Sequence, residues 1–103
     1  GASSNAFSVG GFRFDRAAKQ AHFDNRQIEL RAREVQLLEI LIDNLDRMLT
    51  KEEVADRLYT FDETPSLNAV EQLITRLRRK LKETPLVIKT ARGLGYMAYV
   101  NDD

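Results

Sequence analysis

The 103-residue sequence predicts one α+β domain in which short antiparallel strands precede three helices and a C-terminal β-hairpin. Three observations support this prediction. Apolar residues alternate with polar ones over residues 7–30, they recur at helical spacing over residues 32–82, and the tail is extended around a glycine-containing turn. The opening GASSNA, residues 1–6, is small and polar. We interpret it as an expression remnant with linker character and place the domain at residues 7–101.

The first half of the chain carries local signals for strands and two helices. The runs FSV, FRFD, AHFD and QIEL, punctuated by Gly10-Gly11 and Asp24-Asn25, predict up to four short strands. Residues 32–45 form the first helix, with Glu34 on its polar side. Thr50 followed by Glu53 is a capping box, which predicts that a second, short helix begins there. The apolar stripe of the first helix consists of Val35, Leu38, Leu41, Ile42 and Leu45.

The third predicted helix, residues 67–82, has one apolar and one polar face. Pro65 disfavours helix before it, and Ser66 is suited to cap the helix that begins after it. At 100° per residue the core seam consists of Val70, Ile74, Leu77 and Leu81. The opposite face consists of Asn68, Gln72, Thr75, Arg76 and Arg79.

The stretch TARGLGYMA, residues 90–98, has two interpretations. Gly93-x-Gly95-x-x-Ala98 after a strand is typical of a dinucleotide-binding turn, which needs a helix and a further strand. Only eight residues follow Gly95, so we expect a hairpin in which both glycines have positive φ and Arg92 stands at the tip.

Composition and charge narrow the classes of function. The net charge is zero, but residues 1–67 sum to −3 and residues 68–95 to +5, which favours a surface that faces a polyanion. The chain has no cysteine and one histidine, His22, and its carboxylates show no recognisable pairing. We therefore expect no enzyme, cofactor, metal site or membrane span.

The predicted element order is that of a winged helix-turn-helix, whose third helix, about 22 Å long, suits a DNA major groove. VEQLITRLRRKL and IKTARGLGY closely resemble the effector domain of OmpR/PhoB-type bacterial response regulators. LRAREVQLLEIL resembles that family's first-helix motif, and RLYTFDETPSLNAVE is similar to its polymyxin-resistance and quorum-sensing subgroup. The resemblance covers roughly residues 8–100.

The resemblance implies a cytoplasmic transcription factor of a two-component phosphorelay. It implies a receiver domain, absent from this chain and phosphorylated through a sensor kinase. The isolated domain would be a monomer that dimerises on direct repeats of double-stranded DNA. By position, the residues facing bases would be Asn68, Ala69, Gln72, Leu73 and Arg76, with Thr75, Arg78, Arg79 and Thr90 at the DNA backbone and Arg92 in the minor groove. A loop for RNA polymerase would include Thr60, Phe61, Asp62, Glu63 and Thr64.

Several alternatives stay open at this level. Leu73 replaces a common histidine and fits either the edge of the core or a thymine methyl contact. Arg78 fits either a phosphate contact or an ion pair with Glu71. Arg31 stands where the family has a threonine cap, so the first helix either is capped otherwise or frays. For the whole domain, the alternative function is a winged helix that binds protein instead of DNA.

Overall fold

The computed structural model describes residues 6–60, 63 and 66–101. Its N-terminal part is a four-stranded antiparallel sheet. Its strands, in sheet order, are β1 (Ala6–Val9), β2 (Phe12–Asp15), β3 (Gln20–Phe23) and β4 (Arg26–Ile28). Phe12 and Phe14 alternate with exposed Arg13 and are at most 1% exposed, so the period-two pattern of the sequence places one face of the sheet on the core. The prediction of up to four strands is confirmed.

Helices α1 (Ala32–Asp43) and α2 (Lys51–Leu58) follow the sheet. α1 ends two residues before the predicted boundary because Asn44 terminates it: its side-chain amide donates to the Ile40 carbonyl at 2.7 Å. The capping box of α2 forms as predicted. The Thr50 hydroxyl accepts from the Glu53 N–H at 3.0 Å, and the Glu53 carboxylate accepts from the Thr50 N–H at 2.9 Å.

Helix α3 (Leu67–Lys80) is capped by Ser66, whose hydroxyl accepts from the Ala69 N–H at 3.1 Å. The helix ends at Lys80, two residues short of the predicted boundary, and Leu81 is its C-cap. The four residues of the predicted seam, Val70, Ile74, Leu77 and Leu81, are each at most 2% exposed, which confirms the predicted core face.

The tail forms the predicted hairpin of β5 (Leu86–Ala91) and β6 (Gly95–Val100). Gly93 has φ 77° and Gly95 has φ 146°, which confirms that both glycines adopt positive φ. The α1–α2 connection pairs with the hairpin in an antiparallel bridge between Leu49 and Tyr96, with backbone hydrogen bonds of 2.8 and 2.7 Å.

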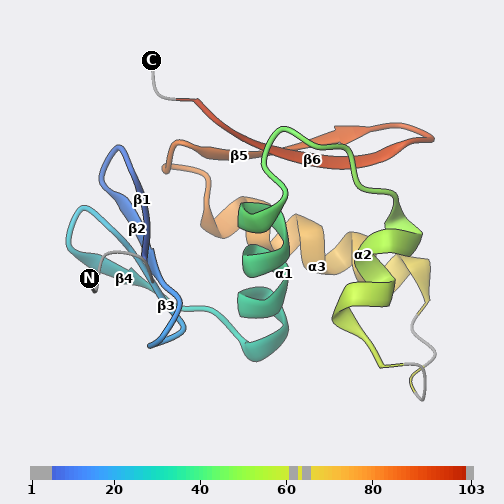
Figure 1. Ribbon diagram of the computed structural model, residues 1–103, viewed down its shortest axis with the longest axis horizontal. Helices are drawn as coiled ribbons and strands as arrows, with labels where there is room; N and C mark the ends of the chain where they lie inside the picture. Colours follow the sequence, from blue (N-terminus) through green and yellow to red (C-terminus); the bar gives the residue numbers. More distant parts are fainter. Residues whose placement is uncertain (1–5, 61–62, 64–65, 102–103) are drawn as a thin grey trace.

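The three helices pack on one another beneath the hairpin, and the N-terminal sheet covers the other side of α1 (Figure 1). One hydrophobic core joins side chains from the N-terminal sheet, all three helices and both hairpin strands. The structure is therefore a winged helix-turn-helix, as the sequence predicted. The hairpin is the wing, and the polar face of α3 remains uncovered by the other elements.

Candidate nucleic-acid interface

The outward face of α3 is the first part of the candidate site. Asn68, Gln72, Thr75, Arg76 and Arg79 are all exposed, as the helical wheel predicted, and together with Glu71 they line a shallow hollow. The Thr75 hydroxyl donates to the Glu71 carbonyl at 2.9 Å. Amides and guanidiniums on one exposed helical face form the donor and acceptor set that reads base edges in a major groove.

Two residues that the family resemblance placed at the bases lie deeper. Ala69 is half-buried, and Leu73 is 7% exposed and belongs to the hydrophobic core. The structure thus favours the core-edge alternative for Leu73, because little of its side chain remains available to a base. Both residues nevertheless border a second depression, between the start of α1 and α3, together with Gln72 and Arg76.

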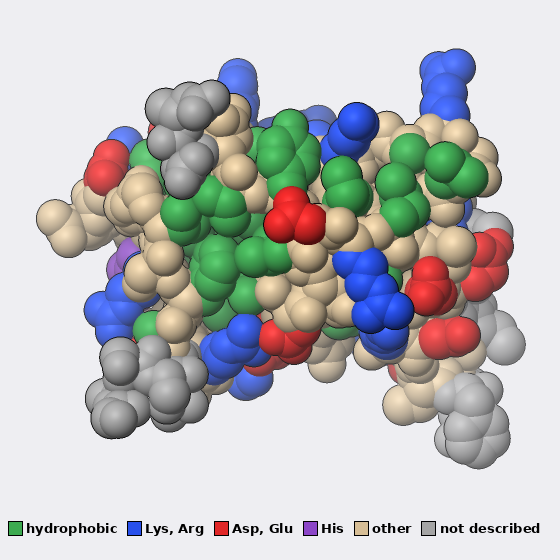
Figure 2. Space-filling view, turned by 45° about the horizontal axis from the view of Figure 1, so that its top comes forward, with side chains coloured by type: hydrophobic (Ala, Val, Ile, Leu, Met, Phe, Trp, Pro, Cys, Tyr) green, Lys and Arg blue, Asp and Glu red, His purple; other side chains and the backbone are tan. Residues whose placement is uncertain are grey.

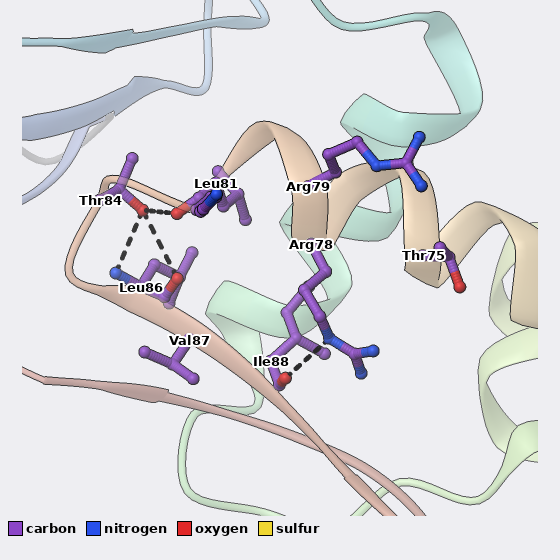
Figure 3. Close-up of a pocket in the computed structure, with 9 residues that line it drawn as sticks. Thr75, Arg78, Arg79, Leu81, Thr84, Leu86, Val87 and Ile88 are labelled. Atoms are coloured by element: carbon purple, nitrogen blue, oxygen red, sulfur yellow. Dashed lines mark hydrogen bonds between the residues drawn. The ribbon is translucent and has the colours of Figure 1, made fainter.

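Arg78 does not pair with Glu71, so that alternative was wrong. Its Nε donates to the Ile88 carbonyl of β5 at 3.1 Å (Figure 3), and its NH2 group donates to the Thr90 hydroxyl. Glu71 instead pairs with Lys51, the first residue of α2. That hydrogen bond raises the pKa of the Lys51 ammonium above its ordinary value.

The wing supplies the second part of the candidate site. Arg92, Gly93 and Leu94 are exposed at its tip, and Leu94, at 64% exposure, is not part of the hydrophobic core. Gly95 is buried, because the backbone of the α1–α2 connection lies against it. A Cβ atom at this position would stand 1.9 Å from the Leu49 carbonyl oxygen. The exposed tip therefore projects from a part of the wing that packs directly against the backbone of the α1–α2 connection.

The loop predicted to contact RNA polymerase is only partly described. Phe61, Asp62 and Thr64 lie outside the described residues. Glu63 accepts from the Thr60 N–H at 2.9 Å and from Arg33 of α1 at 2.6 Å. The Thr60 hydrogen bond and the nearby Arg33 hold the pKa of the Glu63 carboxyl below its ordinary value. The Arg33 guanidinium also lies 4.4 Å from the centroid of the Tyr59 ring, so one arginine of α1 contacts both the residue that precedes this loop and Glu63 within it.

Glu34 differs from its expected place on the polar side of α1. It is 1% exposed, and its Oε1 atom accepts from the Arg31 N–H at 2.8 Å and from Lys80 at 2.6 Å. Glu34 therefore caps the start of α1, which resolves the question raised by the missing threonine at Arg31. Burial acts to raise the pKa of the Glu34 carboxyl, but these two partners outweigh it and hold the pKa below its ordinary value.

The charged side chains on the hairpin side of the molecule are interspersed in sign. In Figure 2, lysines and arginines on the visible, described part of this side stand apart from one another, with acidic side chains among them and an apolar area at the left. The exposed half of α3 differs, because Arg76, Arg79 and Lys80 follow one another closely, and Lys82 comes just after the end of the helix. Among the described residues no cluster of His, Cys, Asp or Glu is suited to hold a metal, and no helix is long and apolar enough to cross a membrane.

Sequence reasoning assigned no partner to three residues around this site, Arg33, Lys51 and Glu34, and placed Glu34 on the polar side of its helix. Each makes its contact with an element far along the chain, such as Lys51 with Glu71 or Glu34 with Lys80. Periodicity and spacing in the sequence do not predict such ion pairs between distant elements, because helical patterns identify only neighbours within one or two turns of the same helix.

Comparison with known proteins agrees with this geometry. The family model "Transcriptional regulatory protein, C terminal" matches residues 25–98. The Escherichia coli O157:H7 transcriptional regulatory protein QseB is 35% identical over 96 residues, which cover 93% of this chain and 43% of QseB. The chain thus spans about two fifths of the length of the curated relatives it matches.

Two solved structures share the fold. The DNA-binding domain of Bacillus subtilis CssR superposes with a TM-score of 0.77 at 27% identity, covering 84% of this chain and 98% of that one. The Klebsiella pneumoniae RstA DNA-binding domain, solved in complex with the RstA box, has a TM-score of 0.75 at 24% identity, covering 89% and 94%. Since the family model spans most of the chain and the fold agrees, this chain belongs to the C-terminal domains of transcriptional regulatory proteins found in OmpR/PhoB-type response regulators.

Proposed function

We propose that this chain is a sequence-specific double-stranded DNA-binding domain, with α3 in the major groove and the wing in the minor groove. The observation that carries the proposal is the outward face of α3. Gln72 and Arg76 are exposed four residues apart, so both side chains can reach one half-site. The excess of positive charge over residues 68–95 adds attraction to phosphate.

Each exposed residue has a role that follows from its chemistry. Arg76 can donate in a bidentate manner to guanine O6 and N7, and Gln72 can pair with adenine N6 and N7. Thr75 and Arg79, beside them, suit phosphate oxygens, and Asn68 stands near the start of the same face. Arg92 at the exposed wing tip suits a narrow minor groove, where the negative potential is concentrated.

The wider context is also a proposal, supported by the family membership. We expect a receiver domain elsewhere in the full protein, controlled by a sensor kinase, and a cytoplasmic role in transcription with no catalytic activity. We expect the domain to be monomeric without DNA and to occupy two direct repeats about 10–10.5 bp apart, measured centre to centre. A dimer seen by light scattering without DNA would contradict the monomer.

The direct test is selection of binding sites from random DNA, followed by titration of the selected duplex. Gln72→Ala or Arg76→Ala should each cost about 1–3 kcal/mol on the selected site and relax preference at one or two base pairs. The matched controls are Gln27→Ala and Arg26→Ala, which alter the same residue types at exposed positions of β4.

Two results would contradict the proposal in different ways. Equal losses on selected and scrambled DNA would remove the base-reading role of α3. Failure to select any sequence, with no salt-dependent DNA binding, would favour the alternative of a winged helix that binds protein.

A further inference from the structure

One arginine connects the helix assigned to the major groove with the wing assigned to the minor groove. Arg78 lies in the second half of α3 and is half-buried. Its guanidinium reaches two positions of β5, the Ile88 carbonyl at 3.1 Å and the Thr90 hydroxyl. Figure 3 shows the side chain extending from α3 across to the strand, at the edge of a groove of about 510 Å³ between these elements.

The second contact lies where β5 becomes exposed, whereas β6 opposite it stays packed through Tyr96 and Gly95. Ile88 is 4% exposed and belongs to the core, whereas Thr90 is exposed and pairs with Tyr96 in the hairpin register. Beyond Thr90 there is one further paired position, Ala91 with Gly95, and then the tip with Arg92. The direction of the tip therefore depends on the contacts that hold β5 at residues 88–90 and on the packing of Gly95 and Tyr96 against the α1–α2 connection.

The geometry of the two contacts suits an arginine. A planar guanidinium presents Nε and NH2 donors in a fixed fork, so it can bond a carbonyl and a hydroxyl two residues apart on one strand. A lysine has one terminal ammonium on a flexible stem and can keep the charge while losing this two-point attachment.

We propose that Arg78, through Thr90, is a positioning residue that fixes the wing relative to α3 and thereby couples the insertion of Arg92 to the seating of α3. This inference rests on the proposed function for its consequence at DNA, but the fixing of the wing is a property of the free domain. The competing account is that the Leu49–Tyr96 bridge and the buried Ile88 hold the wing alone.

The absence of native cysteine allows a direct measurement of wing position. Spin labels at Gln27→Cys on β4 and Leu94→Cys at the wing tip, both exposed positions, report the distance between the N-terminal sheet and the tip in the free domain. We expect Arg78→Lys and Thr90→Val each to broaden the distance distribution. Thr90→Ser, which keeps the hydroxyl, should restore the narrow distribution.

The matched control is Arg79→Lys, the same change one residue along at an exposed position, which should leave the distance distribution as in the parent. Thermal melts of all variants confirm that they are folded. Distributions for Arg78→Lys and Thr90→Val that superimpose on the parent would overturn the proposal, whether or not the domain binds DNA.

A double-mutant cycle on one duplex tests the consequence for binding. If Arg78 acts by aiming Arg92, the fold loss of affinity for Arg78→Lys with Arg92→Ala should be smaller than the product of the two single losses. A loss equal to that product would show that the two residues act independently and would contradict the coupling. Lack of any DNA binding by the parent would instead refute the proposed function and leave the distance measurement standing.

Discussion

Gly95 offers a prediction whose size can be worked out from the structure. A Cβ atom at Gly95 would lie 1.9 Å from the Leu49 carbonyl oxygen, 2.7 Å from its carbonyl carbon and 2.8 Å from the Thr50 Cα. All three are backbone atoms, so no side chain can rotate away. The φ of 146° is also unfavourable for any residue with a Cβ.

Gly93 is the matched control within the same turn. Its φ is 77°, but nothing lies within 4 Å of the position its Cβ would occupy. Gly93→Ala therefore isolates the cost of positive φ, about 1–2 kcal/mol. Gly95→Ala adds the displacement of the Leu49–Thr50 backbone, and overpacking of this kind costs about 1–3 kcal/mol more.

Because 1.9 Å lies far inside van der Waals contact, we expect the added cost at Gly95 to reach the upper end of that range. For a domain of this size each kcal/mol lowers Tm by about 4–8 °C. The assay is urea denaturation and thermal melting of the two variants in parallel, with unfolding monitored by circular dichroism. Equal destabilisation by Gly93→Ala and Gly95→Ala would refute the reasoning, because it would show that the α1–α2 connection does not press on the wing.

Three further predictions concern charge. Arg79→Ala should weaken specific and nonspecific binding alike and reduce the slope of log affinity against log salt by about one unit; an unchanged slope would argue against a phosphate contact. Arg92→Ala should leave Tm nearly unchanged, because the side chain is exposed, yet lower DNA affinity most on duplexes with an A·T-rich flank. An equal loss of affinity on duplexes with G·C-rich flanks would show that Arg92 contacts only phosphate. The lowered pKa of Glu34 means that its stabilisation is complete above its unfolded-state pKa of ~4.3 and is lost as pH falls through the folded-state value. Glu34→Gln should therefore be less stable at pH 7, by about 1–3 kcal/mol, and lose less unfolding free energy below pH ~4.3, whereas parallel stability curves would exclude this role.

The local signals in the sequence were sufficient for the elements and for the outward face of α3. Thr50 with Glu53, and Ser66 with the N–H of Ala69, are contacts between residues three apart, so the sequence contains both partners. The helical period of the apolar residues in α3 is also a local signal, and it places Gln72 and Arg76 opposite the core seam. Together with these local signals, the order of the elements and the glycine-containing hairpin predict the winged-helix fold.

Only the tertiary structure determined which charged side chains form hydrogen bonds and ion pairs between elements of the domain. Glu34 looked like a surface residue of an amphipathic helix, but Lys80, 46 positions away, and the Arg31 N–H make its burial favourable. Arg78 and Lys51 likewise find partners on other elements, which helical spacing cannot report. Gly95 is the clearest case. The sequence identified it as a turn residue, whereas the backbone of Leu49, brought beside it by packing of the α1–α2 connection on the wing, excludes a side chain there.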